Sequence, residues 1–209
     1  MPLTPLYPIV DVDLCRERRL DPLVLLDAYL RGGASLIQLR DKSSPGGGRL
    51  DLASTMVRAA HAAGARLVVN DRADVARLAG ADGVHVGQDD LSAYDVRRIV
   101  GDEAIVGVST HDPDQLAAAA RSTASYLAVG PIYGTTTKAT GYEARGLDLV
   151  RRAAAFGRPV VAIGGITLAH ARDVLGAGAA SVAVISDLMV GDPEERVRAY
   201  LKALGPAVG

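Results

Sequence analysis

Eight short apolar runs alternate with segments of helical periodicity along this chain of 209 residues, and this alternation restricts the fold more than any other feature of the sequence. Strand-like runs separated by helices are typical of repeated βα units. Because each run is almost continuously apolar, we expect strands that are buried on both faces and paired in parallel. The predicted strands are residues 6–10, 36–40, 67–70, 83–86, 104–109, 126–130, 160–163 and 182–185.

The intervals between these runs are rich in Ala, Leu and Arg and predict helices. Gly64 and Gly80 each stand between a helix and the next strand, where a left-handed helix C-cap favours a residue without Cβ. Trp is absent and Phe occurs once, so the core has to be built from Ala, Val, Leu and Ile, which suits an α/β fold. The predicted helices are residues 23–30, 50–63, 75–79, 93–99, 113–120, 147–155, 168–175 and 194–204.

Two α/β architectures can hold eight such units: a closed barrel and an open, doubly wound sheet. The chain is short for a barrel, which commonly has about 250 residues. The open sheet is disfavoured because no Gly-x-Gly-x-x-Gly turn follows the first strand and because polar residues end nearly every strand. We therefore predict an α/β protein with a single (β/α)8 TIM-barrel domain over residues 1–209.

Charge and cysteine content argue against several kinds of partner. The formal net charge is −1, so no overall positive field attracts nucleic acid or an anionic membrane. Cys15 is the single cysteine and cannot form an internal disulfide. The first residues show no signal-peptide pattern, and no run of about 18 apolar residues occurs. We therefore expect a cytoplasmic protein that binds neither nucleic acid nor membrane.

In a barrel, polar residues at the carboxyl ends of the strands share one rim, where the active sites of this fold lie. Gln38, Arg40 and Lys42 point in one direction from the second predicted strand, a pattern that fits a solvated charge cluster as well as an anion site. Residues 43–48, Ser-Ser-Pro-Gly-Gly-Gly, predict a mobile loop beside them, either a linker or a lid over substrate. The other candidates on this rim are Asn70, Asp71, Gln88, Asp90, Ser109, residues 135–138, Gly164, Gly165 and Ser186.

Two carboxylates and two histidines on this rim each have more than one interpretation. Asp71 and Asp90 follow neighbouring strands, and their hard oxygen ligands suit Mg²⁺ shared with substrate phosphates. Each also stands near a predicted helix start, and helix capping is favoured for either residue taken alone. His85 lies within an apolar strand, where a lone histidine is more often a core residue than a catalyst, and His111 could cap the next helix. No Ser–His–Asp or Cys–His grouping is apparent, which disfavours covalent acyl chemistry.

Two parts of the rim could bind phosphate. Residues 130–138 end in three threonines and a lysine, whose hydroxyl, amide and ammonium groups could surround an anion, with a plain turn as the alternative. Gly164, Gly165 and Ser186 follow the seventh and eighth strands, the usual phosphate site of this barrel. We therefore expect two phosphate subsites and two small phosphorylated substrates.

Motifs in a fixed order run through the whole chain. They are Gln-Leu-Arg-Asp-Lys at 38–42, Asn-Asp-Arg-Ala-Asp at 70–74, Gly-Val-His-Val-Gly-Gln-Asp-Asp-Leu at 83–91, Gly-Val-Ser at 107–109, Gly-Pro at 130–131 with Thr-Thr-Thr-Lys at 135–138, Ala-Ile-Gly-Gly-Ile at 162–166 and Val-Ala-Val-Ile-Ser at 182–186. In this combination they resemble the thiamine phosphate synthase family. The resemblance implies a Mg²⁺-dependent transferase that joins 4-amino-2-methyl-5-hydroxymethylpyrimidine diphosphate to 4-methyl-5-(2-hydroxyethyl)thiazole phosphate and releases diphosphate. It also implies a dissociative mechanism, in which the pyrimidine C–O bond breaks before the thiazole nitrogen attacks.

The same resemblance implies roles for individual residues at matching positions. Asp71 and Asp90 correspond to the metal ligands, and Gln38 and His85 to residues that line the pyrimidine. The residues implied to bind the diphosphate are Arg40, Lys42, Asn70, Ser109 and Lys138, and all of these except Asn70 are also implied to be catalytic. The residues implied to bind the thiazole phosphate are Thr135, Thr136, Thr137, Gly165, Ile185 and Ser186.

Two other functions stay open on the same barrel. A related thiazole tautomerase uses a histidine after the sixth strand, where this chain has Gly130-Pro131, and this difference argues for the synthase. A non-catalytic phosphate-ligand sensor would be expected to lack the carboxylates or Lys138, and all are present. Residues 139–146 differ from the proline-rich loop that the family leads us to expect, which bears on loop closure and substrate tolerance. A homodimer and the use of a carboxylated thiazole phosphate also stay open.

Overall fold

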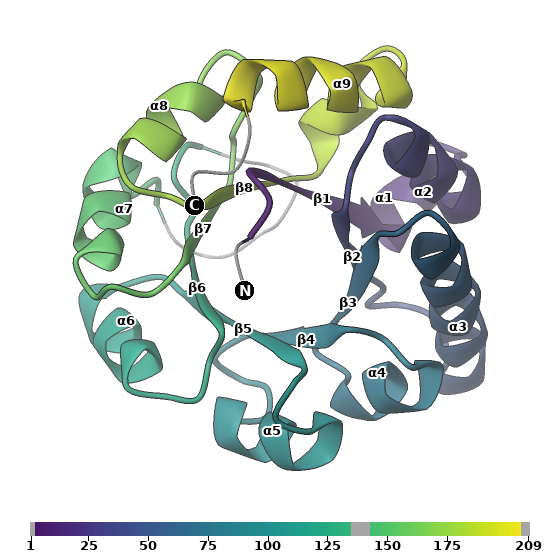
Figure 1. The fold of residues 1–209 in the computed structure, drawn as a ribbon, viewed down its shortest axis with the longest axis horizontal. Coiled ribbons are helices and arrows are strands. Elements are labelled where there is room, and N and C mark those ends of the chain that lie inside the picture. The colour runs from purple at the N-terminus through teal and green to yellow at the C-terminus, as the bar shows by residue number, and fades with distance from the viewer. Residues whose placement is uncertain (1–2, 135–142, 206–209) are drawn as a thin grey trace.

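The first strand pairs in parallel with both the second and the eighth, which closes the sheet into a barrel. The computed structural model describes residues 3–134 and 143–205 of the chain, and within these ranges the strands follow one another around the barrel in sequence order (Figure 1). The strands are β1 (Leu6–Asp11), β2 (Leu36–Arg40), β3 (Arg66–Asn70), β4 (Gly83–Val86), β5 (Ile105–Thr110), β6 (Tyr126–Val129), β7 (Val160–Ile163) and β8 (Ser181–Val184).

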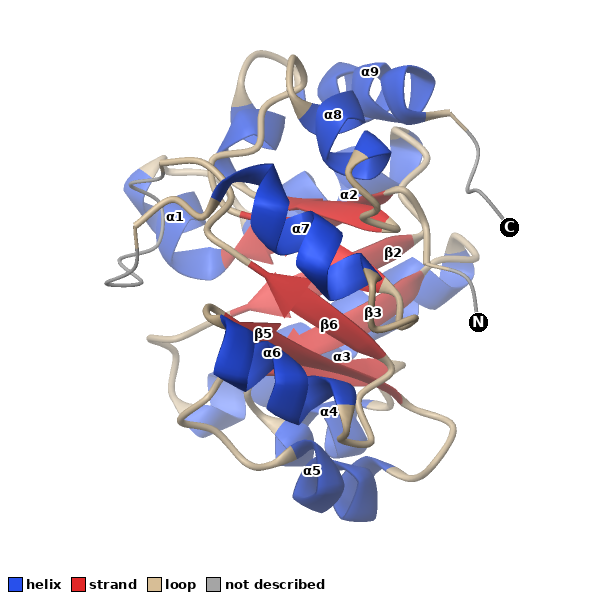
Figure 2. Ribbon diagram, turned by 90° about the vertical axis from the view of Figure 1, so that its left-hand side faces the viewer, coloured by secondary structure: helices blue, strands red, loops and turns tan. Residues whose placement is uncertain are grey.

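Helices surround the barrel and cover the outer face of the sheet (Figures 1 and 2). This arrangement confirms the predicted (β/α)8 TIM barrel. The helices are α1 (Val12–Glu17), α2 (Pro22–Arg31), α3 (Gly46–Ala62), α4 (Ala73–Ala79), α5 (Ala93–Val100), α6 (Pro113–Ala120), α7 (Gly146–Ala154), α8 (Ala171–Gly176), the 3-10 helix η1 (Ser186–Met189) and α9 (Pro193–Leu204).

The core has two layers because neighbouring residues of a strand point to opposite faces. Val10 and Leu39 face outward and pack in the layer between strands and helices. Ile9 faces inward and belongs to a second cluster inside the barrel, together with the buried Tyr7 and Tyr126. Several members of this inner cluster, including Tyr7, Ile9 and Tyr126, also line the cavity described below.

Two short helices, α1 and η1, are absent from the prediction, because six and four residues are too few to show helical periodicity. The first of them begins directly after Asp11, whose Oδ1 accepts a hydrogen bond of 3.0 Å from the Leu14 backbone N–H. This bond is a typical N-cap contact. β1 also includes Asp11, one residue beyond the predicted end of the strand.

The prediction of a mobile loop over residues 43–48 is wrong for its second half. Gly46, Gly47 and Gly48 form the first turn of α3, which starts at Pro45 as N-cap. The helix buries Ala53, Met56, Val57 and Ala60 farther along, and this packing extends the helix back through three residues of poor helix propensity.

Because these glycines are helical and exposed, replacing two of them should stabilise the protein. Nothing lies within 4 Å of a Cβ built at Gly47 or Gly48. We expect the double variant Gly47→Ala/Gly48→Ala to be more stable by about 1–2 kcal/mol, because glycine costs about 0.5–1 kcal/mol relative to alanine in a helix. Thermal unfolding measures the gain. Unchanged turnover would exclude a lid role for this segment, whereas reduced turnover in a stabilised protein would support one.

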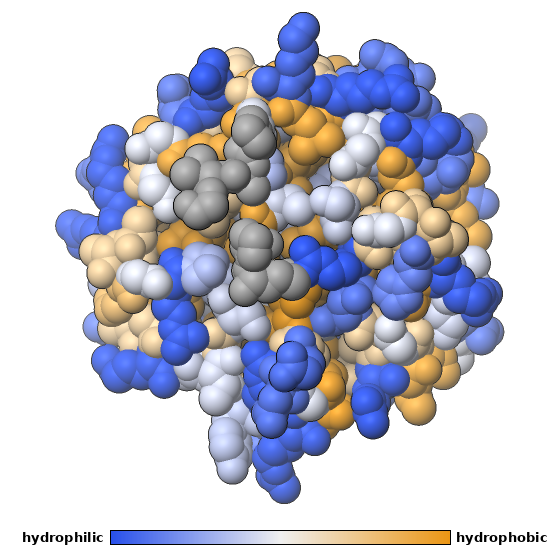
Figure 3. Space-filling view, in the orientation of Figure 1, coloured by the Kyte–Doolittle hydropathy of each residue, from blue (hydrophilic) through white to orange (hydrophobic). Residues whose placement is uncertain are grey.

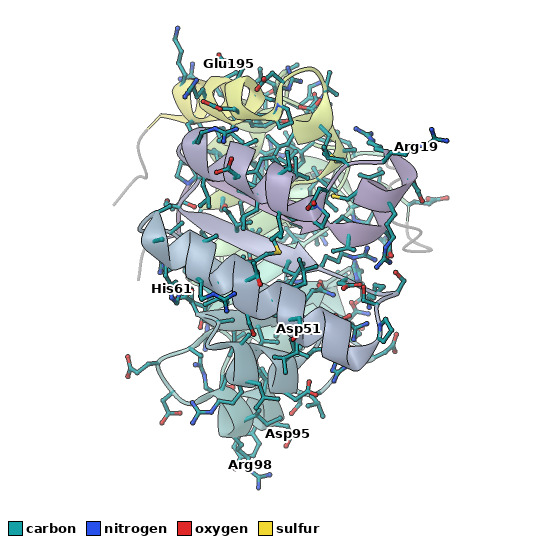
Figure 4. All side chains as sticks on the ribbon, turned by 90° about the vertical axis from the view of Figure 1, so that its right-hand side faces the viewer. Arg19, Asp51, His61, Asp95, Arg98 and Glu195 are labelled. Atoms are coloured by element: carbon teal, nitrogen blue, oxygen red, sulfur yellow. The ribbon has the colours of Figure 1, made fainter. Side chains whose placement is uncertain are left out.

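Polar side chains cover the periphery of the molecule, over the outer faces of the helices (Figure 3). Figure 4 shows His61 and Asp51 on α3, and Asp95 and Arg98 on α5, on this outer surface. The side chain of His61 is 46% exposed. Within the described ranges, no helix is long and apolar enough to cross a membrane.

Candidate active site

A cavity of about 380 Å³ opens at the carboxyl ends of the strands. This volume is within the range of small-molecule sites, about 300–1,000 Å³. Most predicted site residues that the structure describes contribute to its walls, although they come from strands far apart in the sequence. The predicted residues that line the cavity are Gln38, Arg40, Asn70, His85, Ser109, Gly165, Ile185 and Ser186.

A chain of hydrogen bonds crosses the base of the cavity. Gln38 Nε2 donates to the Tyr7 hydroxyl at 3.2 Å, and the Tyr126 hydroxyl donates to the Tyr7 hydroxyl at 3.3 Å. His85 Nδ1 lies 2.9 Å from the Tyr126 hydroxyl, and His85 Nε2 lies 2.8 Å from Ser109 Oγ. Burial raises the pKa of Tyr7 to about 12 and that of Tyr126 well above its usual value, so both phenols stay protonated. The two phenols therefore present neutral polar groups to a ligand.

His85 is held in this cavity and not isolated among apolar side chains. Its ring stacks on Tyr126 with centroids 5.7 Å apart and planes inclined by 15°. It is partly exposed and lines the cavity, so the interpretation of His85 as an ordinary core histidine is wrong. Tyr7 and Tyr126 are absent from the sequence prediction, because a tyrosine in an apolar strand has the same pattern as any core residue.

Two further contacts fix the ends of β2 and β5. Arg40 forms an ion pair with Asp11, with Nη1 2.5 Å from Oδ2, and both side chains are largely buried. Gln88 Nε2 donates to the Ser109 carbonyl at 2.5 Å, which connects the segment after β4 to the end of β5. Asp11, like Tyr7 and Tyr126, is absent from the residues predicted from the sequence.

Asp71 and Asp90 face one another across the ends of β3 and β4. Desolvation, together with the hydrogen bond and the charge of the nearby Asp71, raises the pKa of Asp90, while the Gly87 N–H at 2.8 Å and Lys42 act in the opposite direction. Lys42 also forms an ion pair with Asp71. Lys42, Asp71 and Asp90 are not among the residues that line the cavity itself, but Asp71 directly follows the lining residue Asn70.

Helix capping does not explain either carboxylate. The N-cap of α4 is Arg72, which makes no side-chain capping bond, and that of α5 is Ser92, which bonds the Asp95 N–H. Asp71 instead has a left-handed backbone, with φ of +64°, and its N–H donates to the His85 carbonyl at 2.7 Å. Its carboxylate contacts Lys42 and Asp90 and caps neither helix.

The donor set of Asp71 and Asp90 fits Mg²⁺. No group of three or more His, Cys, Asp or Glu side chains occurs in the described part of the chain. Magnesium does not need one, because it keeps several waters and binds proteins through one or two carboxylates together with substrate phosphates. A divalent cation held by both residues would also offset the charge of Asp71, which contributes, after desolvation, to the raised pKa of Asp90.

The backbone of Gly164 and Gly165 forms part of the opposite wall of the cavity. Gly165 has a φ of +63°, and a Cβ built there would clash with the Gly134 carbonyl and lie 2.8 Å from Tyr133 Cβ. Tyr133 N–H in turn donates to the Gly164 carbonyl at 2.9 Å. The glycines at this position are therefore required by the close approach of the segment after β6, in addition to any approach of an anion.

A carboxylate in this wall, that of Asp187, joins three elements. Asp187 Oδ2 accepts hydrogen bonds from the Leu168 N–H at 3.1 Å, from Arg196 Nη2 at 2.8 Å and from the Tyr200 hydroxyl. These contacts connect the segment after β7 to η1 and α9. Asp187 therefore fixes the position of the backbone segment that carries Gly165 relative to the one that carries Ser186.

The prediction for His111 is corrected by the structure, and the predicted residues 135–138 are not described by it. His111 does not cap α6, whose N-cap is Asp112, and its Nδ1 lies 2.7 Å from the Gly130 carbonyl in the cavity wall. The predicted residues Thr135, Thr136, Thr137 and Lys138, and the unusual segment that follows them up to residue 142, lie outside the described residues.

Comparison with known proteins agrees with this geometry. A model of the thiamine monophosphate synthase family matches residues 6–188. The thiamine-phosphate synthase of Roseiflexus castenholzii is 47% identical over 195 residues, which cover 92% of this chain and 85% of the relative. That of Koribacter versatilis is 45% identical and covers 95% of both chains.

Solved structures are also similar to this chain. The thiamine phosphate pyrophosphorylase from Pyrococcus furiosus superimposes with a TM-score of 0.85 at 32% identity, covering 96% of this chain and 95% of that chain. A 3-hexulose-6-phosphate synthase, at 18% identity and a TM-score of 0.69, shares the fold alone. The family match and the relatives over nearly the whole length show that this chain belongs to the thiamine monophosphate synthase family.

Proposed function

We propose that this protein is a transferase that joins the pyrimidine diphosphate to the thiazole phosphate, forming thiamine phosphate and free diphosphate. The observation that carries the proposal is the asymmetry of the cavity. One wall has polar side chains, including Arg40, His85 and Ser109, and the opposite wall has the backbone of Gly164 and Gly165. Two differently phosphorylated substrates suit two such walls.

The polar wall suits the pyrimidine diphosphate. Gln38 and His85 are fixed by the hydrogen-bond chain at the base and can orient the pyrimidine ring. Arg40, Asn70 and Ser109 stand above them, where the diphosphate would extend toward the rim. Lys42, and Lys138 from the undescribed segment, are proposed to add positive charge at the rim.

Bond breaking at the pyrimidine is proposed to precede bond formation. The C–O bond between the pyrimidine methylene and the diphosphate breaks, and the electron pair leaves with the diphosphate. The thiazole nitrogen then donates its lone pair to the methylene carbon, so no proton has to be removed. Arg40 and Ser109 would stabilise the negative charge that grows on the leaving group. Mg²⁺ held by Asp71 and Asp90 would supply further neutralisation of the diphosphate.

The backbone wall suits the thiazole phosphate. Gly165, Ile185 and Ser186 line this side of the cavity, and residues 135–137 are proposed to complete it. Ser186 stands at the first position of η1, so its hydroxyl and nearby backbone N–H groups can both face an anion.

Ser186→Ala separates these two contributions. We expect thiazole phosphate to bind more weakly by about 1–3 kcal/mol if the hydroxyl donates to the phosphate, and by less if the backbone N–H does so. Binding of pyrimidine diphosphate should not change. Calorimetry with each substrate alone measures both, and a larger loss on the pyrimidine side would contradict this assignment of the walls.

The direct test is product formation from the two purified substrates, with and without Mg²⁺. Thiamine phosphate and diphosphate in equal amounts are expected, with a strong dependence on the metal. Isomerisation of thiazole phosphate without condensation would indicate a tautomerase, and binding without turnover would indicate a sensor. Cytoplasmic location and a homodimer stay predictions.

A further inference from the structure

Asp11 is a buried carboxylate beside the cavity-lining Arg40, in a position that the reaction itself does not explain. It ends β1 opposite Arg40 at the end of β2, and the two residues are partners in the parallel register of these strands. Its side chain is 4% exposed, against 16% for that of Arg40. A buried carboxylate beside an arginine that is meant to bind an anion reduces the positive charge available to that anion. It therefore needs a different role.

The two oxygens of Asp11 make two different contacts. Oδ1 accepts the Leu14 N–H at 3.0 Å and fixes the start of α1, while Oδ2 accepts Arg40 Nη1 at 2.5 Å. Within the described residues, the Arg40 side chain makes no other hydrogen bond, and Arg40 lines the cavity. The ion pair thus uses one N–H group of the planar guanidinium and leaves the others for a ligand.

We propose that Asp11 is a positioning residue that holds Arg40 in the orientation needed to bind the diphosphate of the pyrimidine substrate. This inference rests on the proposed function. A flexible arginine loses conformational entropy when it binds an anion, and a fixed one has already lost it. Asp11 also connects this orientation to α1, so the helix and the arginine are held by one side chain.

The positioning role and a purely electrostatic role predict effects of opposite sign. If Asp11 only neutralised Arg40, removing its charge would strengthen the binding of diphosphate. If it orients Arg40, the same change weakens binding. Asp11→Asn is the suitable variant because asparagine is as good an N-cap as aspartate, so the start of α1 is retained while the ion pair is lost.

The probe is inorganic diphosphate in the presence of Mg²⁺, measured by calorimetry and as a product inhibitor. We expect Asp11→Asn to weaken its binding roughly 10- to 100-fold, the range seen when a partner that orients a ligating side chain is removed. The KM for pyrimidine diphosphate should rise in parallel, with the KM for thiazole phosphate unchanged. Asp21→Asn is the matched control, since Asp21 is the exposed N-cap of α2 and bonds the Leu23 N–H.

A double variant tests whether the effect passes through Arg40. In an Arg40→Ala background, Asp11→Asn should cause no further loss of diphosphate binding, whereas an independent role would give the same loss again. Wild-type or tighter diphosphate binding by Asp11→Asn, in a protein that forms thiamine phosphate, would overturn this inference alone. A wild-type protein that neither binds diphosphate nor forms product would overturn the proposed function and this inference with it.

Discussion

Asp71→Asn and Asp90→Asn are each expected to lower turnover by roughly 100-fold or more while the protein stays folded. The reason is loss of charge at the proposed Mg²⁺ site, where the leaving diphosphate needs neutralisation. Asparagine tolerates the left-handed backbone of Asp71 as well as aspartate does, so the φ of +64° does not confound that variant. Turnover as a function of Mg²⁺ concentration is the measurement, with half-saturation shifted to higher Mg²⁺ in both variants.

Asp89→Asn provides a matched control for these variants. Asp89 is an exposed carboxylate adjacent to Asp90, and the proposed site does not include it. It should retain the turnover and Mg²⁺ dependence of the parent. If Asp71→Asn and Asp90→Asn also retained both, the two carboxylates would have no role in metal binding, and the proposed metal site would be wrong.

Gly165→Val should reduce thiazole phosphate binding at least about tenfold, a loss of about 1.4 kcal/mol, and should also lower stability. A left-handed backbone is strained for valine, and strain of this kind costs on the order of 1–3 kcal/mol. The new Cβ would also clash with the Gly134 carbonyl, so the segment after β6 has to move. Calorimetry with each substrate and thermal unfolding measure the two effects, with pyrimidine diphosphate binding little changed.

Gly176→Ala is the control for glycine replacement elsewhere in the same βα unit, at the C-terminal end of α8. Gly176 is the last residue of α8, and a Cβ built there meets nothing within 4 Å. Substrate binding should be unchanged and stability equal or slightly higher. Gly165→Ala, which is less strained, covers the case in which the valine variant does not fold. Parental thiazole phosphate affinity in a folded Gly165 variant would place that phosphate elsewhere on the rim.

The barrel could be predicted from the sequence because its signals are local. Each strand is marked by a short apolar run and each longer helix by its periodicity, and a chain of repeated parallel βα units has few ways to close. The exception shows the limit of local signals: Gly46, Gly47 and Gly48 have loop composition, and only the packing of Met56 and Ala60 farther along makes them helical.

The candidate site likewise contains residues that the sequence predicts and contacts that it does not. Gln38, Arg40 and Ser109 could be placed on the rim from strand position alone, because carboxyl ends of parallel strands meet at one end of a barrel. Their partners could not be predicted: Asp11 lies 29 residues from Arg40, and Tyr7 lies 119 residues from Tyr126. Such contacts depend on the register between strands and on which side chains meet inside the closed barrel. The sequence by itself thus determined which polar residues reach the cavity at the carboxyl ends of the strands. The tertiary structure decided which hydrogen-bond and ion-pair partners fix each of them, because a buried polar group can bond only to the partners that the strand register brings within hydrogen-bond distance.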